Sequence, residues 1–131
     1  ERAQSLFREL EQSKVEDMLL HGDLHHDNIL FDGRRGWLCI DPKGVIGDSL
    51  FNAARFLNNP NPELMHMENL QNVTERRLNI LSEVLHADRK RLAAWVYVDA
   101  ILMASWWIES GGKTCDFSLR CAEIFDEILS T

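Results

Sequence analysis

The opening of the chain places its apolar residues on one face of a helix. Ala3, Leu6, Phe7 and Leu10 recur at i, i+3, i+4 and i+7, and this pattern fades in EQSKVED. The short apolar run at 18–20 predicts a strand. Two further runs, NILF and WLCI, flank DGRRG, whose Asp-Gly pair and second glycine predict a hairpin turn.

The rest of the chain favours helices. Apolar spacing predicts them at roughly 49–58, 63–86, 89–110 and 116–130. The segment NNPNP separates the first two, Asp88 is placed to cap the third, and Gly111 and Gly112 end it. No repeat, low-complexity tract or interdomain linker interrupts the pattern. The predicted architecture is a single domain over 1–131, mainly α with a small β-hairpin.

The helix predicted at 89–110 carries the longest apolar stripe, and most of that stripe is expected to be buried. The stripe comprises Leu92, Trp95, Val96, Asp99, Leu102, Met103 and Trp106. Three tryptophans of this helix, with Met103, have two interpretations. Their helical spacing favours packing in the core, and a stacking wall for a ring-shaped substrate is the alternative; they are Trp95, Trp106 and Trp107.

Composition narrows the range of functions. The chain has 131 residues, 45% hydrophobic, with a net charge of −7, so nucleic acid, which requires a basic surface, is not an expected partner. The three cysteines lack CxxC spacing, which argues against a disulfide framework and favours a cytoplasmic location. No apolar run approaches the roughly 20 residues of a membrane span, and the first residues do not resemble a signal peptide. A membrane partner is therefore not expected.

Polar residues gather around the predicted hairpin. If Phe31 pairs with Leu38, antiparallel pairing continues until Asn28 lies opposite Asp41 at the open end. Mg²⁺ takes oxygen ligands, often one or two carboxylates together with substrate phosphates. Asn28 and Asp41 are therefore the predicted metal ligands.

Asp23 lies five residues before Asn28, in a loop that can curl back toward the same point. A carboxylate beside a bound phosphate donor can orient a hydroxyl group and accept its proton. His21, Asp23 and Asn28 match the spacing H-x-D-x-x-x-x-N of the kinase catalytic loop, and Asp41 takes the place of the aspartate in D-F-G. The pattern predicts Asp23 as the catalytic base.

Three stretches together resemble the aminoglycoside phosphotransferase family, and in particular its streptomycin kinase and hydroxyurea kinase branch. They are HGDLHHDN, IDPKGVIGD and the long helix RLAAWVYVDAILMASWWIESG. The resemblance implies the C-terminal lobe of a protein-kinase-like α+β fold, ATP and Mg²⁺ as cofactors, and a small-molecule acceptor whose hydroxyl is phosphorylated, conferring antibiotic resistance. It also implies that Asp23 is the catalytic base and that Asn28 and Asp41 hold magnesium.

The chain departs from the family pattern G-D-P-x-x-D at two positions. Ser49 replaces the proline, but Asp48 can still cap the following helix. Asn52 replaces the second aspartate, whose kinase counterpart braces the catalytic loop, and its amide can hydrogen-bond without bringing a charge. Among the supporting residues, His21 is expected to hold the loop by hydrogen bonds. Lys43 is expected either to approach phosphate oxygens or to pair with a carboxylate.

Kinase-like enzymes of this family hold ATP between two lobes, and no glycine-rich run precedes Asp23. The chain is therefore expected to be the C-terminal lobe, with the N-terminal nucleotide lobe absent. Self-association is expected through the apolar surface that would otherwise face that lobe.

Three alternatives accompany this interpretation. The chain could be a non-catalytic lobe that keeps the motif as a scaffold. GDLHHDN also resembles a fragment of the dinuclear metallophosphoesterases, although their further metal ligands are not evident downstream. Zinc binding by His21, His25 and His26 is the third alternative, and their spacing in a tight loop suits a tetrahedral site poorly.

Overall fold

The computed structural model describes residues 1–60 and 63–131. Its α-helices are α1 (Arg2–Gln12), α2 (Leu50–Leu57), α3 (Leu70–Val84), α4 (Arg89–Glu109) and α5 (Asp116–Ser130). Its strands are β1 (Met18–Leu20), β2 (Ile29–Asp32), β3 (Gly36–Cys39) and β4 (Val45–Gly47), and two short 3₁₀ helices, η1 (His26–Asn28) and η2 (Glu63–His66), complete the elements. The described fold is mainly helical with a small β part, as expected, but this part consists of two antiparallel sheets where one hairpin was predicted.

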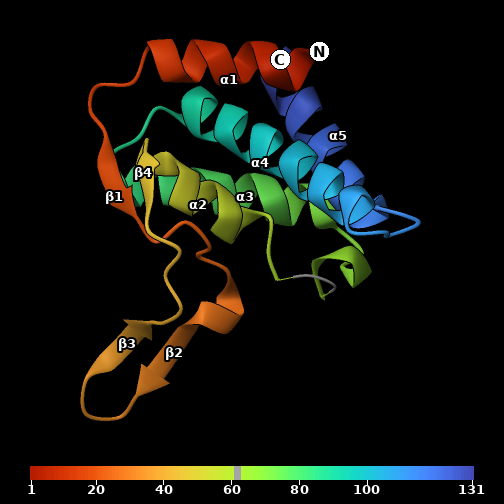
Figure 1. The fold of residues 1–131 in the computed structure, drawn as a ribbon. Helices are drawn as coiled ribbons and strands as arrows, with labels where there is room; N and C mark the ends of the chain where they lie inside the picture. The colour runs from red at the N-terminus through yellow and green to blue at the C-terminus, as the bar shows by residue number, and fades with distance from the viewer. Residues whose placement is uncertain (61–62) are drawn as a thin grey trace.

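Helix α4 is the centre of the helical layer. It packs against α1, α2, α3 and α5, and in Figure 1 the hairpin β2–β3 extends away from these helices. The helix begins as predicted, because the Asp88 side chain accepts a hydrogen bond of 2.7 Å from the Arg91 amide, and it ends before Gly111, whose φ is +91°. By length and composition α4 could cross a membrane, but half of its most apolar window is buried among the other helices, as in the core helix of a globular protein.

The first part of α4 is buried as predicted and the last part is not. Leu92, Trp95 and Val96 are almost completely buried, whereas Trp106 and Trp107 are 50% and 56% exposed. The expectation that these two tryptophans belong to the core is therefore wrong. Helical spacing alone did not show which turns of the helix the rest of the chain covers.

The segment between α2 and α4 also differs from its prediction. The expected helix at 63–86 is divided into η2 and α3, and the break predicted at NNPNP falls partly on residues 61–62, which lie outside the described residues. Strand β4 was not predicted. It pairs with β1 in the register Met18 with Gly47, Leu19 with Ile46 and Leu20 with Val45.

The hairpin forms where predicted but in a register shifted by one residue. Phe31 pairs with Trp37 and Leu30 with Leu38, so the predicted pairing of Phe31 with Leu38 is wrong. The Asp32 carboxylate accepts hydrogen bonds from the amides of Arg34 and Arg35, at 3.0 and 2.8 Å. Gly36 then adopts a φ of +79° and pairs with Asp32, which closes a three-residue loop instead of a two-residue one.

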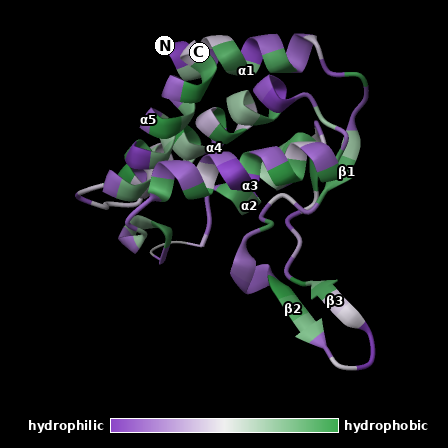
Figure 2. Cartoon of the chain, turned by 180° about the vertical axis from the view of Figure 1, so that it is seen from behind, coloured by the Kyte–Doolittle hydropathy of each residue, from purple (hydrophilic) through white to green (hydrophobic). Residues whose placement is uncertain are grey.

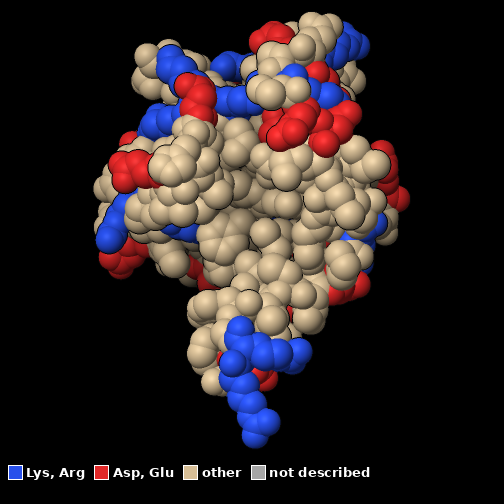
Figure 3. Space-filling view, turned by 90° about the vertical axis from the view of Figure 1, so that its left-hand side faces the viewer, with Lys and Arg blue, Asp and Glu red and all other residues tan. Residues whose placement is uncertain are grey.

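Both sheets leave apolar side chains exposed. Leu19 is 78% and Ile46 70% exposed on the β1–β4 sheet, and Phe31 and Trp37 are 65% and 72% exposed on the hairpin. Figure 2 shows the hydrophobic colouring of β1 and β2, and Figure 3 shows a broad uncharged surface above the basic tip of the molecule.

Candidate active site

The loop that follows β1 is fixed by its own hydrogen bonds. His21 Nε2 donates to the carbonyl of Ile40 at 2.7 Å, and its Nδ1 accepts from the Asp23 amide at 3.2 Å. His21 therefore has the loop-holding contacts expected of it. It joins the start of the loop to the end of β3, and both of its ring nitrogens are occupied.

Gly22 is required at the bend of this loop. Its φ is +83°, and a Cβ atom there would lie 2.7 Å from the side chain of Val45. The Gly22 amide donates to Asn52 Oδ1 at 3.2 Å. An amide side chain at position 52 thus contacts the candidate catalytic loop, as expected for a bracing residue.

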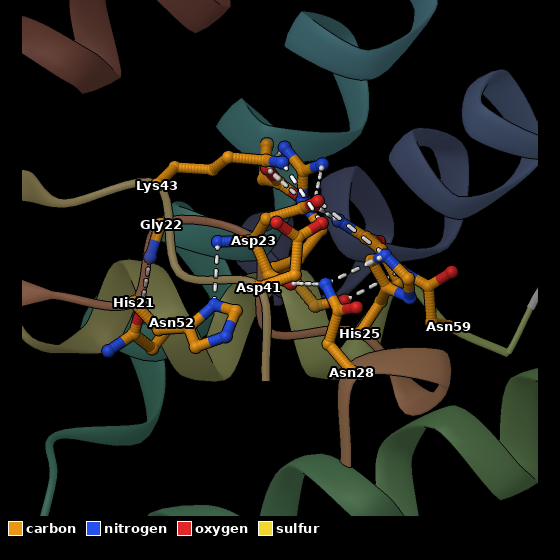
Figure 4. A network of polar contacts seen from close by, with 12 residues as sticks. His21, Gly22, Asp23, His25, Asn28, Asp41, Lys43, Asn52 and Asn59 are labelled. Carbon is orange, nitrogen blue, oxygen red and sulfur yellow. Dashed lines mark hydrogen bonds and ion pairs between the residues drawn. The ribbon is translucent and has the colours of Figure 1, made fainter. Parts of the chain in front are cut away.

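Asp23 lies close to two basic side chains, Arg55 and His25, of which Figure 4 labels His25. Arg55 Nη1 lies 3.3 Å from Asp23 Oδ1, and His25 Nε2 lies 3.5 Å from Oδ2. The Asp23 side chain is 24% exposed, so it is accessible to a bound molecule. The carboxylate is therefore both oriented by the protein and open on one side.

Arg55 is itself fixed by a buried carboxylate. Its Nε and Nη2 donate to Asp99 Oδ1 at 3.1 and 2.8 Å, and Asn58 donates to Asp99 Oδ2 at 2.9 Å. Asp99 is completely buried, and this burial raises the pKa of its carboxyl group, an effect that Arg55 and Asn58 partly offset. Sequence reasoning missed Arg55 and Asn58. The available signal was Asp99 itself, because a carboxylate inside an apolar stripe needs a buried partner.

Asn28 is buried with its amide nitrogen occupied. Nδ2 donates to the backbone carbonyl of Asp23 at 2.9 Å and lies 3.2 Å from His25 Nε2. Within residues 1–60 and 63–131, no group donates a hydrogen bond to Asn28 Oδ1. The amide is therefore oriented so that its oxygen can serve as a ligand.

Asp41 lies next to the residue that pairs with Asn28, instead of opposite Asn28 as predicted. The Ile40 amide donates to the Asn28 carbonyl at 2.9 Å, and the Lys43 amide donates to the His21 carbonyl at 2.7 Å. These bonds hold the Asp41 segment against the candidate catalytic loop on both sides. Asp41 has a φ of +54°, and its exposed carboxylate pairs with Lys43 Nζ at 3.2 Å, the carboxylate contact expected as one of two roles for Lys43.

These residues fit Mg²⁺ better than zinc. One amide oxygen, one carboxylate and substrate phosphates make a typical magnesium site. In the described part of the chain, no three His, Cys, Asp or Glu side chains come together as a metal cluster. His21 is occupied by backbone groups, and His26 stacks on Phe56 at 4.5 Å between ring centroids. The zinc alternative is therefore not supported.

Asp48 has a structural role. Its carboxylate accepts from the Leu50 amide at 2.9 Å, as expected for a cap of α2, and also from Arg91 and Trp95 of α4. Burial acts to raise the pKa of Asp48, but these hydrogen bonds outweigh it and lower the pKa below its ordinary value. Arg91 also donates to the Leu10 carbonyl at 2.9 Å, so this cluster joins α1, α2 and α4.

A carboxylate that can accept a proton, beside an amide oxygen and a second carboxylate that can bind Mg²⁺, is typical of phosphotransferases. Residues 1–111 match the family model described as aminoglycoside/hydroxyurea antibiotic resistance kinase. The chain belongs to this family.

Individual relatives agree with this assignment. The streptomycin 6-kinase of Streptomyces glaucescens is 37% identical over 100 residues, covering 76% of this chain and 33% of the relative. The streptomycin 3''-kinase of Klebsiella pneumoniae is 37% identical over 111 residues, covering 83% and 42%. The hydroxyurea phosphotransferase of Kitasatospora aureofaciens is 35% identical over 95 residues, covering 72% and 26%. The chain thus spans less than half the length of these relatives. No solved structure matches it.

Proposed function

We propose that this chain is the C-terminal catalytic lobe of an ATP-dependent small-molecule kinase. The enzyme transfers the γ-phosphoryl group of ATP to a hydroxyl group of a streptomycin-like aminoglycoside or of hydroxyurea and so confers antibiotic resistance. The observation that carries the proposal is the contact between Asn28 and the Asp23 backbone at 2.9 Å, which joins the candidate base and a candidate metal ligand in one loop. The names of the relatives support the choice of acceptor.

In this proposal each residue has a separate task. Asp23 orients the acceptor hydroxyl and takes its proton, and Arg55 holds the Asp23 carboxylate in place. Asn28 Oδ1 and the Asp41 carboxylate would hold Mg²⁺, which when bound neutralises charge on the transferring phosphoryl group. His21 and Asn52 keep the loop in its shape, since both bond to its backbone.

The nucleotide would lie between this lobe and a second one. Kinase-like folds cover the phosphates with a glycine-rich loop and pair them with a lysine. The relatives are much longer than the matched region, and we infer that the corresponding groups belong to a part of the enzyme that this chain does not span.

The test is an Asp23→Asn substitution in the enzyme that contains this lobe together with its nucleotide lobe. General-base assistance contributes about a hundredfold to ten-thousandfold in rate, so phosphoryl transfer from labelled ATP should fall by at least about a hundredfold. Binding of Mg·ATP should remain close to that of the wild type. Asp27→Asn is a matched control, because Asp27 lies in the same loop with an exposed side chain.

Two results would reject the proposal. One is an Asp23→Asn enzyme with wild-type turnover on its best acceptor. The other is a wild-type enzyme that hydrolyses phosphoesters with Mn²⁺ and ignores ATP, which would favour the metallophosphoesterase alternative. A wild-type enzyme that binds Mg·ATP but phosphorylates no acceptor would favour the non-catalytic lobe.

A further inference from the structure

A cavity of about 350 Å³ borders the candidate catalytic loop. Gly22, the neighbour of Asp23, forms part of its wall, and the remaining wall comes from α1, the β1–β4 sheet, α2 and α4. Four aromatic side chains line it: Phe7, Phe51, Trp95 and Trp106. An aromatic cavity with few polar groups is typical of a small-molecule site.

The cavity continues beyond the loop. A second cavity of about 620 Å³ lies between α1 and α4 and shares Phe7, Phe51, Trp95 and Leu102 with the first. The combined space extends from the catalytic loop along the helices. This space is much larger than a molecule such as hydroxyurea requires, and it suits a ligand that contains several rings.

Among the aromatic side chains that line the cavity, Trp106 is connected to the candidate base through Arg55. The Arg55 guanidinium lies 5.6 Å from the centroid of the Trp106 ring, and the same guanidinium lies 3.3 Å from Asp23 Oδ1. Trp106 is 50% exposed, so one part of its ring is free for a ligand. Arg55 therefore fixes the distance between the candidate base and this aromatic surface.

The charge at the rim of the first cavity is negative, while the second cavity is lined by one acidic and one basic side chain, Glu1 and Arg8. Glu11 lines the cavity, and the single ammonium group of Lys14 is shared between Glu11 and Asp17, each at 2.7 Å. One cation between two carboxylates leaves a net negative charge. Asp48, the other lining carboxylate, is already bonded to Arg91 and Trp95.

We propose that this cavity is the acceptor subsite and that Trp106 selects for a ring-bearing, hydroxylated acceptor with a cationic substituent. A ring of the acceptor stacks on Trp106, the cation lies toward Glu11, and the reacting hydroxyl reaches Asp23 past Gly22. This assignment rests on the phosphotransferase function proposed above. It favours a streptomycin-like acceptor over hydroxyurea, which would fill only a small part of this cavity of about 350 Å³.

The experiment measures binding of streptomycin to the 131-residue chain by calorimetry, with no nucleotide present. Trp106→Ala should weaken binding by about tenfold, because it removes an aromatic contact surface, and Trp106→Phe should recover most of the affinity. Glu11→Gln should weaken binding more at low salt than at high salt. Trp107→Ala is the matched control, since Trp107 is the next residue of α4, is similarly exposed and lines a different cavity. Its affinity should equal that of the wild type.

Each outcome tests the proposed acceptor subsite independently of the proposed phosphoryl transfer. Equal affinities for the wild type and Trp106→Ala would overturn the proposal. So would a folded wild-type chain, judged by circular dichroism, that binds neither streptomycin nor other ring-bearing hydroxylated amines. Neither result would change how the Asp23→Asn test of the kinase function is interpreted. Conversely, weakened binding by Trp106→Ala, together with a full enzyme that transfers no phosphoryl group, would support the subsite and reject the kinase function.

Discussion

Arg55 holds Asp23 from a buried position. Its Nη1 lies 3.3 Å from Asp23 Oδ1, while its Nε and Nη2 donate to the fully buried Asp99 carboxylate. A guanidinium presents several donors in a rigid plane, so fixing two of them on Asp99 also fixes the third. The orientation of the candidate base is thus determined by a carboxylate in the middle of α4.

Arg55→Lys should reduce phosphoryl transfer in the full enzyme by about tenfold to a hundredfold, because an ammonium group cannot bond Asp99 and orient Asp23 in the same geometry. The Kd of Mg·ATP should change little, since Arg55 contacts neither candidate metal ligand in the described structure. Measurement of kcat and of nucleotide affinity separates the two effects. A simple loss of folded protein would instead lower the apparent kcat and the amount of nucleotide bound in the same proportion.

The same ion pair should contribute strongly to stability when only one partner is removed. Arg55→Gln leaves Asp99 as a buried charge without its cation and should lower the free energy of unfolding by about 3–5 kcal/mol. The double variant Arg55→Gln with Asp99→Asn removes both charges and should regain much of this loss. Urea unfolding of the wild type, the two single variants Arg55→Gln and Asp99→Asn, and the double variant tests the coupling, and additive losses would show that the two residues are independent.

Asp41→Asn should weaken magnesium binding, whereas Asp23→Asn should not. Loss of the carboxylate weakens the proposed metal site, so both nucleotide affinity and turnover should fall, and raising the Mg²⁺ concentration should restore part of each. A titration of activity against Mg²⁺ measures this, with Asp27→Asn as the control. A magnesium dependence identical to that of the wild type would remove Asp41 from the site.

The depressed pKa of Asp48 predicts a particular dependence of stability on acid. Burial would raise this pKa, but the bonds from Leu50, Arg91 and Trp95 lower it, so the folded state binds the proton less well than the unfolded state. Such a carboxylate stabilises the fold above its unfolded pKa of about 3.9, and the contribution is lost as the pH falls through the lower folded pKa. The free energy of unfolding should therefore decline below about pH 4 in the wild type.

Asp48→Asn should make that decline shallower. At neutral pH the variant should be less stable by about 1–3 kcal/mol, because Arg91 loses a charge-assisted partner. Urea unfolding at several pH values measures both effects. Asp17→Asn is the control, since Asp17 forms an ion pair at a well-exposed position. Parallel curves for Asp48→Asn and the wild type would contradict the assigned role.

Local patterns predicted the elements better than their contacts. The spacing of Leu6 and Leu10 identified α1, and Asp88 identified the start of α4, because both signals depend on residues within a few positions of each other. The hairpin register was wrong by one residue because the Asp32 side chain stabilises a three-residue loop, a choice that the Asp-Gly pair did not specify.

Contacts between distant segments were less predictable. The motif spacing brought Asp23 and Asn28 into one loop, and the structure shows them in contact. Arg55 and Asp99 are 44 positions apart, and nothing local to Arg55 indicates that its side chain turns inward. Trp106 has the same helical phase as buried residues of α4 and yet is 50% exposed, so its exposure could not be predicted from spacing within the helix.

The three cysteines should differ widely in reactivity. Burial raises the pKa of the Cys121 thiol to about 12, so at about pH 8 almost none of it is thiolate, the form that reacts. Cys39 lies on the hairpin with an exposed side chain. Treatment of the folded chain with iodoacetamide at about pH 8 should therefore modify Cys39 quickly and leave Cys121 unmodified, and addition of urea should make all three cysteines reactive. Mass spectrometry of the digested protein locates the label, with Cys39→Ser as the control that removes the fast phase. Rapid labelling of Cys121 in a chain whose circular dichroism remains native would show that α5 does not pack against the core as the structure places it.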